Sequence, residues 1–499
     1  MPSLPSAGTR VADVAVVGAG AAGLYAALCA AREGARVVLV SATPLAQTAS
    51  YWAQGGLAAA LAQDDSFELH LRDTELAGRG LVRRSAAETL VREAPGRVHD
   101  LQALGVRFDA DRFGQLALGL EGGHSIRRVV HAGGSATGRR VVRQLSALAA
   151  AEPLIEVFEG ARAHALWIDE GPADPRCQGL VCDDGRMVCA RAVVIATGGA
   201  AALWARTTNP PGSQGVGLLL AHAAGAALAD LELMQFHPTA VIGVPGREGF
   251  LVTEAIRGEG ATLHDADGER FVDELAPRDE VSRAIEQRLQ ESGSSSVGLD
   301  MRSIDPTHFP NVVAALRDAG LDPTRELVPV APAAHYMMGG IVTDLSARST
   351  VPGLYAVGES SCTGLHGANR LASNSLSECF VFAARAIADA LSHPAERPPV
   401  VDERALEQLR ELPAPAAAER STRAALWQDV GIVRTPEGLE RVLDDPHPLA
   451  RLIARCAFAR TESRGAHLRT DHPERDPRLD LRHIVVVSSD EQLSCQTWR

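Results

Sequence analysis

Two arginines and two histidines stand out as side chains that could bind a small acidic substrate. Arg278 precedes a segment with helical periodicity, Arg370 lies in a glycine-rich stretch, and His237 and His335 follow apolar residues. The planar guanidinium fork matches a carboxylate, and imidazole or hydroxyl groups, such as that of Thr253, add hydrogen bonds that fix its orientation. Taken singly, each residue has an ordinary explanation as a core histidine, a solvated cation or a loop residue. Their joint occurrence in this order favours a functional site.

The basic residues are of one type. The sequence contains no lysine, so all 49 basic residues other than histidine are arginine. Schiff-base chemistry, pyridoxal-phosphate catalysis and a lysine nucleophile are therefore excluded. Asparagine occurs only four times, and Asn369 and Asn374 account for two of the four. This concentration draws attention to residues 358–376.

A glycine turn near the start of the chain predicts a dinucleotide site. Val11–Val17 is apolar and β-branched, glycines follow it, and an Ala/Leu-rich segment continues to Glu33. The order strand, turn, helix brings backbone N–H groups and the helix dipole to a pyrophosphate. The acidic residue that would bind a ribose about 20 positions later is missing, because Ser41 follows the second apolar run. Nicotinamide loses support, whereas a flavin nucleotide with Ser41 as a hydrogen-bonding residue remains compatible. The residues expected at the nucleotide in this turn are Gly18, Ala19, Gly20, Ala21 and Gly23.

Three later segments are expected at the same nucleotide. Gly198 and Gly199 follow a second strand-like run at Ala192–Ala196, and Glu359 follows a third at Gly353–Val357. Asn374, Ser375 and Leu376 precede the apolar helical pattern of Phe380–Leu391, so they lie at a helix N-terminus. The positive end of that helix can stabilise negative charge on the pyrimidine of a reduced flavin.

The three strand-like runs predict an α/β fold in which three separate segments of the chain each contribute a strand to the nucleotide-binding sheet. Met234–Arg348 mixes strand and helix signals, and a proline- and alanine-rich linker after residue 394 leads into helical periodicity. We therefore expect a Rossmann-like FAD-binding domain at 10–233 and 349–395. An inserted α+β capping domain is expected at 234–348 and a C-terminal helical domain at 402–490. The final residues, Ile484–Arg499, indicate no role.

Composition excludes several classes of protein. The net charge of −13 argues against binding to nucleic acid or to an anionic membrane, and no apolar run reaches the roughly 20 residues of a membrane span. The eight cysteines contain no CxxC pair, which argues against an iron–sulfur, zinc or other metal site. Residues 1–10 show no signal-peptide pattern. The sequence predicts a cytoplasmic protein with reduced thiols.

Six segments carry a resemblance to a known superfamily. They are Gln54-Gly55-Gly56, His237-Pro238-Thr239, Thr253–Gly260, Leu275–Asp279, Ala333–Gly340 and Gly358–Leu376. In order and spacing, from about Val11 to Asp471, they resemble the signatures of the succinate dehydrogenase and fumarate reductase flavoproteins. The resemblance implies FAD, contacted by the glutamine and glycines of the first segment, and hydride transfer between a four-carbon dicarboxylate and the flavin. Arg278 and Arg370 would bind the carboxylates, and His237, His335 and Thr253 would orient them. Proton transfer by Arg278 is also implied, although an ordinary guanidinium is a weak acid.

Within this superfamily the sequence is most similar to the aspartate oxidases. Ala49 stands where the membrane-complex enzymes have the histidine that attaches FAD, so the FAD is expected to be non-covalent. Leu120–Ser125 resembles an aspartate-oxidase loop in which Glu121 pairs with a substrate ammonium; the ordinary alternative is a surface glutamate. Glu462–His467 resembles the closing motif of that family.

The expected reaction follows from this resemblance. L-Aspartate is oxidised to iminoaspartate, with O2 (giving H2O2) or fumarate (giving succinate) as acceptor, in the first step of de novo NAD biosynthesis, and quinolinate synthase takes the product. Two alternatives stay open. A soluble fumarate reductase or succinate dehydrogenase-type flavoprotein is favoured if Glu121 points away from the pocket. A flavin subunit that only relays electrons is disfavoured by the substrate-type arginines and histidines.

Overall fold

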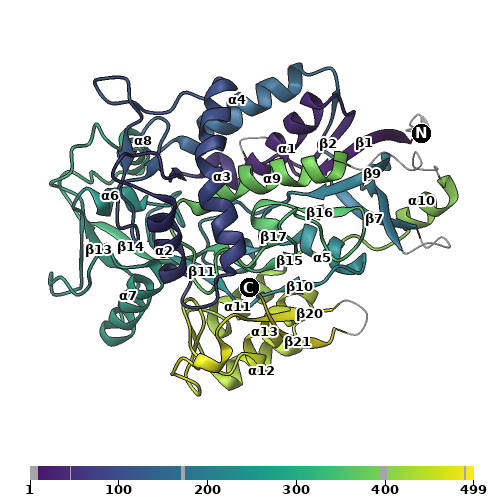
Figure 1. Cartoon of the computed structure of the whole chain (residues 1–499). Helices are drawn as coiled ribbons and strands as arrows, with labels where there is room; N and C mark the ends of the chain where they lie inside the picture. The colour runs from purple at the N-terminus through teal and green to yellow at the C-terminus, as the bar shows by residue number, and fades with distance from the viewer. Residues whose placement is uncertain (1–8, 45–46, 170–174, 393–401, 488–490) are drawn as a thin grey trace.

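The structure is a computed structural model of the chain and describes residues 9–44, 47–169, 175–392, 402–487 and 491–499. It consists of a helix-covered sheet domain, a smaller sheet with its own helices, and a C-terminal part (Figure 1). Residues 1–8, the linker and domain boundary expected at 394–401, and position 490 lie outside the described residues.

A seven-stranded sheet forms the centre of the first part. The three predicted runs form β1 (Arg10–Val17), the end of β9 (Met187–Ile195) and β16 (Leu354–Ala356). β9 pairs in parallel with both β1 and β16, so the carboxyl ends of these strands meet at one edge. Ligands bind at this edge in parallel sheets. The predicted α/β architecture is confirmed.

The two faces of this sheet bury separate hydrophobic cores. Successive side chains of β1 point to opposite faces, so Val14 and Val16 lie in one core and Ala15 and Val17 in the other. The first face packs under α1 (Ala21–Arg32), α3 (Arg84–Ala103), α4 (Thr137–Ala151) and α9 (Asn374–Ser392) (Figure 1). The second packs against α5 (Val216–Ala223) and the C-terminal helices. The other strands are β2 (Val37–Ser41), β6 (Ile155–Glu159), β7 (Ala163–Asp169) and β8 (Arg176–Cys182), in the order β6-β2-β1-β9-β8-β7.

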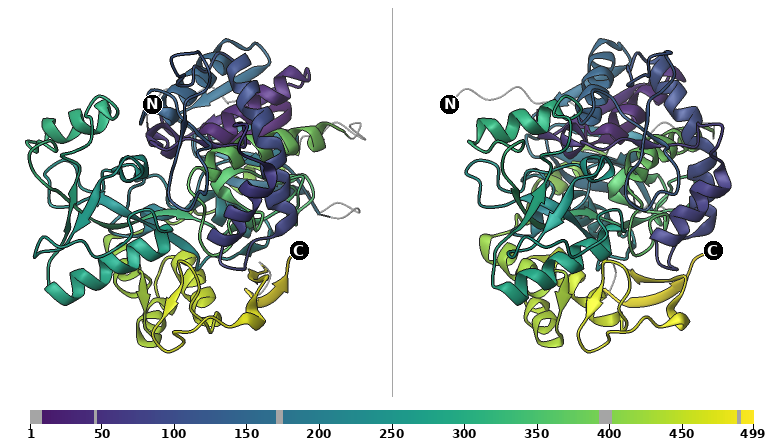
Figure 2. Two further views of the ribbon diagram at one scale, coloured as in Figure 1. Left: turned by 60° about the vertical axis from the view of Figure 1, so that its left-hand side comes forward. Right: turned by 90° about the vertical axis from the view of Figure 1, so that its left-hand side faces the viewer.

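The inserted segment forms a four-stranded antiparallel sheet with its own core, which we call the cap. Its strands, in the order β11-β14-β13-β12, are β11 (Met234–Val241), β12 (Thr262–His264), β13 (Val297–Asp300) and β14 (Val328–Met337). Its helices are α6 (Glu254–Gly258), α7 (Arg278–Ser292) and α8 (Pro310–Asp318). Figure 2 shows the cap projecting to one side of the sheet domain, with the C-terminal part below both.

A five-stranded sheet joins segments that are far apart in the sequence. Its strands, in the order β17-β15-β10-β20-β21, are β10 (Leu228–Ala229), β15 (Gly340–Val342), β17 (Ser361–Cys362), β20 (Arg482–Val486) and β21 (Leu493–Thr497). β15 falls inside the range expected for the cap and β20 inside the range expected to be helical, whereas β21 lies beyond that range, in the final residues for which no role was expected. β15 and β20 are short and both pair with β10, which is distant in the sequence, so the local sequence pattern does not indicate them.

The C-terminal part packs against the large sheet. α11 (Arg420–Asp429), α12 (Pro436–Leu443) and α13 (Pro448–Ala459) join the core under the large sheet, and α10 (Glu403–Arg410) packs against β7 and β8. A two-stranded sheet of β18 (Val433–Arg434) and β19 (Leu468–Arg469) lies among these helices. The described helices include none that is long and apolar enough to cross a membrane.

The hairpin of β20 and β21 is tied to the loop that follows β17. His483 Nδ1 lies 2.5 Å from the Asp230 carboxylate and its ring stacks on Trp498, with ring centroids 4.2 Å apart. Gly364 has no side chain at this point, and a Cβ there would lie 3.0 Å from the Trp498 ring. The last residues of the chain therefore contact the glycine-rich stretch that carries Arg370.

Candidate active site

A cavity of ≈ 400 Å³ opens at the carboxyl ends of β1, β9 and β16 and extends to the cap. Its lining includes all six residues predicted to bind or orient a substrate: Glu121, His237, Thr253, Arg278, His335 and Arg370. Most residues predicted at the nucleotide also line it: Gly18, Ala19, Gly20, Ala21, Ser41, Gln54, Gly55, Gly56, Gly198, Glu359, Ser375 and Leu376. One cavity thus brings together residues separated by more than 300 positions.

Three residues predicted at the nucleotide do not line the cavity. A Cβ on Gly23 would lie 1.8 Å from the Gly18 carbonyl oxygen, and one on Gly199 would lie 2.3 Å from Glu359 Oε1. These glycines allow close packing behind the cavity wall. The Asn374 side chain is buried and bonded to His70 Nε2 (2.8 Å) and to Thr74 Oγ1 (3.1 Å), so it anchors the start of α9 to α2 (Phe67–Ala77).

The nucleotide half of the cavity fits a flavin nucleotide. α1 begins after Gly20, which has no side chain, so a pyrophosphate can approach the backbone at the positive end of the helix closely. Gln54 Oε1 is buried and has no hydrogen-bond partner among the described residues, while Gln54 Nε2 donates to the Leu251 carbonyl. Burial raises the pKa of Glu359 to about 7, although its Oε1 accepts from the Met337 N–H. Ser41 Oγ donates to the Thr43 carbonyl and shapes the loop after β2.

Gln235, which the sequence analysis missed, holds the two arginines. Its side-chain oxygen accepts from Arg278 Nη1 at 3.0 Å and from Arg370 Nε and Nη2 at 3.2 Å. Its amide group donates to Asn369 Oδ1 and to the Arg370 carbonyl, which fixes its orientation. Gln235 and His237 share one face of β11 because they are two residues apart on a strand. The alternation of side chains along a strand is therefore the feature of the sequence from which Gln235 could have been predicted.

The two arginines differ in their partners. Arg278 Nε lies 2.8 Å from Glu254 Oε2, and Glu254 also pairs with the buried Arg257 at 2.9 Å. Among the described residues Arg370 has no carboxylate within ion-pair distance; it bonds Gln235 and Ser375 Oγ and lies 4.2 Å from the Tyr336 ring centroid. Burial and the neighbouring Arg278 lower the pKa of Arg370 to about 10. A buried cation without an anion is costly, so Arg370 is arranged to receive one.

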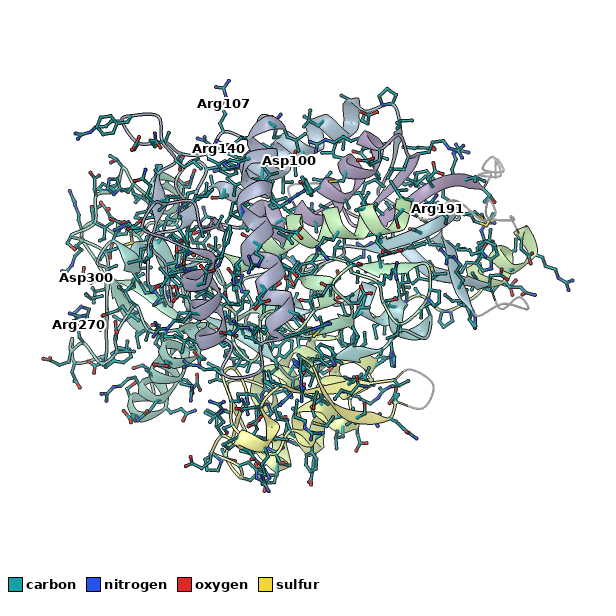
Figure 3. All side chains as sticks on the ribbon, in the orientation of Figure 1. Asp100, Arg107, Arg140, Arg191, Arg270 and Asp300 are labelled. Atoms are coloured by element: carbon teal, nitrogen blue, oxygen red, sulfur yellow. The ribbon has the colours of Figure 1, made fainter. Side chains whose placement is uncertain are left out.

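Charged residues on the surface of the cap differ from Arg370 because they have ion-pair partners. Arg270 and Asp300 stand at its outer edge (Figure 3), where Arg270 pairs with the buried Glu274 and Asp300 pairs with the exposed Arg302. The arginine of each pair is more than half exposed, so solvent screens the pair and its contribution to stability is small. Arg370, which has hydrogen bonds but no ion-pair partner among the described residues, therefore differs from these surface residues.

The two cavity histidines, His237 on β11 and His335 on β14, are neutral imidazoles supplied by the cap. The rings of His237 and His335 are 5.1 Å apart, the Thr239 N–H donates to His237 Nδ1, and His335 Nδ1 lies 2.8 Å from Thr208 Oγ1. Burial, with Arg278 nearby, holds the pKa of each histidine well below its usual range. Since Nδ1 of His237 is an acceptor, its Nε2 carries the proton and can donate. Thr253 caps α6 and lines the cavity beside them.

Glu121 is a buried carboxylate of the cavity wall and not a surface residue. It lies between β4 (Leu118–Gly119) and β5 (Val129–Val130), with 1% of its side chain exposed. Burial alone would raise its pKa, but hydrogen bonds from His131 (3.2 Å) and Ser373 (2.6 Å) and the charge of Arg278 lower it to about 2. The cavity thus holds a fixed negative charge beside two fixed positive charges.

The sequence matches known flavoproteins along its length. Residues 13–376 match an FAD binding domain family, and residues 443–497 match the fumarate reductase flavoprotein C-terminal family. An L-aspartate oxidase of Caulobacter vibrioides is 45% identical, covering 95% of this chain and 96% of the relative. An L-aspartate oxidase of Streptomyces coelicolor is 42% identical, covering 99% and 94%.

Solved structures agree with this match. A quinol-fumarate reductase with menaquinol molecules has a TM-score of 0.89 at 31% identity and covers 99% of both chains. An E. coli quinol fumarate reductase has a TM-score of 0.87 at 30% identity, covering 98% of this chain and 96% of the other. The predicted Rossmann-like FAD-binding fold and the FAD cofactor are confirmed. The chain belongs to the L-aspartate oxidase family of FAD-dependent flavoproteins.

Proposed function

We propose that this chain oxidises L-aspartate to iminoaspartate with non-covalently bound FAD, which supplies the hydride acceptor when bound. The observation that carries the proposal is the charge pattern of the cavity: Arg278 and Arg370 lie beside the ionised Glu121. L-Aspartate carries the complementary set, two carboxylates and one ammonium. An unsubstituted dicarboxylate would leave Glu121 without a cationic partner, which is unfavourable in a buried site.

Each protein group has a role in this scheme. Arg370 and Arg278 bind the carboxylates, His237, His335 and Thr253 donate hydrogen bonds that orient them, and the ammonium faces Glu121. With a pKa of about 2, Glu121 is a weak base, so it serves as a counter-ion to the ammonium and not as the acceptor of its proton. C2 of the substrate loses its hydrogen as hydride and the ammonium releases one proton to solvent, so that the C2=N double bond of the iminium form of iminoaspartate is made.

The second candidate function is fumarate reduction. Arg278, Glu254 and Arg257 form a continuous buried chain of charge-assisted hydrogen bonds that leads from the cavity into the cap. Such a chain can carry a proton toward a substrate carbon. We propose that fumarate and O2 are alternative acceptors for the electrons taken from L-aspartate.

The product defines what must follow. Iminoaspartate is an unstable imine, so an enzyme that consumes it has to act promptly. We propose quinolinate synthase as that enzyme, in de novo NAD biosynthesis, on the basis of the family resemblance. All eight cysteines are free thiols, which supports the proposed cytoplasmic location.

The visible spectrum tests the proposal. Acid precipitation of the purified yellow protein is expected to release the colour into the supernatant, because the position of the attaching histidine is Ala49. Addition of L-aspartate without oxygen is expected to bleach the oxidised flavin band, whereas succinate is expected to leave it. A band that persists with L-aspartate, in enzyme that fumarate reoxidises after chemical reduction, would favour fumarate reduction as the main activity.

The value of kcat/KM should not fall at the pH where an ordinary histidine becomes protonated. His237 and His335 stay neutral at pH values where a histidine of pKa about 6.5 is protonated, because their pKa values are lowered. We therefore expect kcat/KM for L-aspartate to remain flat from about pH 8 to about pH 6. His237→Asn and His335→Asn should lower kcat/KM without moving its acid limb. A wild-type limb centred near 6.5 that disappears in either variant would contradict the assignment.

A further inference from the structure

Two donors from different parts of the chain hold the Glu121 carboxylate. His131 Nε2 contacts Oε1 at 3.2 Å, and Ser373 Oγ donates to Oε2 at 2.6 Å. His131 directly follows β5, whereas Ser373 precedes α9 in the glycine-rich stretch. Each carboxylate oxygen can accept two hydrogen bonds, so each keeps one free position. One accepting position on each oxygen therefore remains for a ligand.

The surrounding backbone is shaped to seat both donors. A Cβ on Gly119 would lie 2.6 Å from the His131 ring, so the imidazole occupies the space of a missing side chain. Ser373 has a backbone φ of +61°, which is uncommon for a residue other than glycine, and its hydroxyl also accepts from the Gly56 N–H at 3.0 Å. A strained residue persists when its surroundings hold it in place, so Ser373 is fixed between Glu121 and the Gln54–Gly56 segment.

His131 acts from behind Glu121. It is not among the residues that line the cavity, and 13% of its side chain remains exposed. The other charged or titratable groups near Glu121 are Arg278 and His124, with Glu254 against the adjacent Gly122. His124 is engaged with Arg128 and the Ala372 carbonyl, and Arg278 with Glu254. His131 and Ser373 are thus the side chains bonded directly to Glu121 among the described residues.

We propose that His131 and Ser373 are positioning residues that make Glu121 the selector for an ammonium-bearing dicarboxylate over a plain one. This inference rests on the proposed function, in which the ammonium of L-aspartate binds Glu121. The two donors fix the direction of the carboxylate and keep it ionised, so that its free oxygen positions face the ligand. A plain dicarboxylate makes no use of this arrangement, so loss of a donor affects the two substrates unequally.

The test compares L-aspartate oxidation with fumarate reduction in His131→Phe and His131→Gln. Phenylalanine fills the space of the ring without a donor, whereas glutamine restores an N–H that can reach Oε1. His131→Phe is expected to raise KM for L-aspartate about 10-fold while changing KM for fumarate less than about 3-fold. The acid limb of kcat/KM for L-aspartate should move to higher pH, because Glu121 loses a group that lowers its pKa. His131→Gln should bring KM for L-aspartate and the position of the acid limb part of the way back to their wild-type values.

A second variant and a benchmark separate the outcomes. Ser373→Ala removes the other donor without changing the space that the His131 ring occupies. It should also raise KM for L-aspartate more than KM for fumarate, and it provides the test if His131→Phe does not fold. Equal changes in KM for both substrates, or no change, would overturn the inference. Glu121→Gln sets the largest effect expected. If it raises KM for L-aspartate while the His131 and Ser373 variants do not, only the two-donor role is wrong. If wild-type enzyme does not turn over L-aspartate, the proposed function and this inference both fail.

Discussion

Arg370→Leu is expected to lower kcat/KM for L-aspartate about 1,000-fold and to leave the free energy of unfolding unchanged or increased. Breaking a buried charge pair between a guanidinium and a substrate carboxylate costs about 3–5 kcal/mol, which corresponds to a factor of roughly 10²–10⁴. The protein itself loses little, because Arg370 has no carboxylate partner among the described residues. Function and stability should therefore respond in opposite directions. Steady-state kinetics and thermal unfolding measure the two effects.

Arg460→Leu is the matched control. Arg460 is also fully buried, but it pairs with Glu232 at 2.6 Å, Glu462 at 3.2 Å and Asp230 at 3.5 Å. Its removal leaves the buried Glu232 without a cationic partner among the described residues, so a loss of about 3–5 kcal/mol in the free energy of unfolding is expected. A comparable loss of stability in Arg370→Leu would show that Arg370 is a structural residue.

Glu121→Gln should reverse the preference of the enzyme between its two substrates. The substitution keeps the shape of the side chain but removes its charge and turns one acceptor into a donor that faces the substrate ammonium. We expect kcat/KM for L-aspartate to fall about 100-fold, in line with the roughly 1.5–3 kcal/mol of a charged hydrogen bond plus the cost of the opposed donor. Fumarate carries no ammonium, so its reduction should change by less than about 3-fold.

Parallel assays of the same purified variant check this prediction. L-Aspartate oxidation can be followed by peroxide formation, and fumarate reduction by oxidation of a reduced viologen dye. FAD content and thermal unfolding should match those of the wild type. An equal fall in both activities would mean that Glu121 organises the cavity as a whole and does not select the substrate.

The parts of the fold predictable from the sequence are those with a local signal. Val11–Val17 became β1 with a difference of one residue, because an apolar β-branched run followed by glycines is specified locally. The helix expected to follow Arg278 begins at Arg278 itself, since Asp279 and Glu280 suit its first turn. β15 and β20 could not be predicted, because both pair with β10, which is more than 100 residues away from each of them in the sequence.

The same distinction applies to the candidate site. Arg278, Arg370, His237 and His335 belong to segments that can be recognised one at a time, and the structure places them at one cavity. Ser373 and His131 acquire their importance only through Glu121, which is 252 positions from Ser373. Asn374 was expected at the cofactor for its place at a helix start, yet its side chain turns toward His70. The direction of a side chain at a helix terminus depends on tertiary packing, which the sequence pattern does not contain.

The contact between the C-terminal hairpin and the stretch after β17 bears on the order in which the parts of the fold form. β20 pairs with β10, which lies more than 250 positions earlier, and Trp498 packs on Gly364. Domains generally fold in the order in which they leave the ribosome. The sheet domain and the cap precede the hairpin in the sequence and can form before it, whereas the five-stranded sheet can close only after β20 and β21 have emerged. We therefore expect the glycine-rich stretch that carries Arg370 to become fixed later than the nucleotide-binding turn.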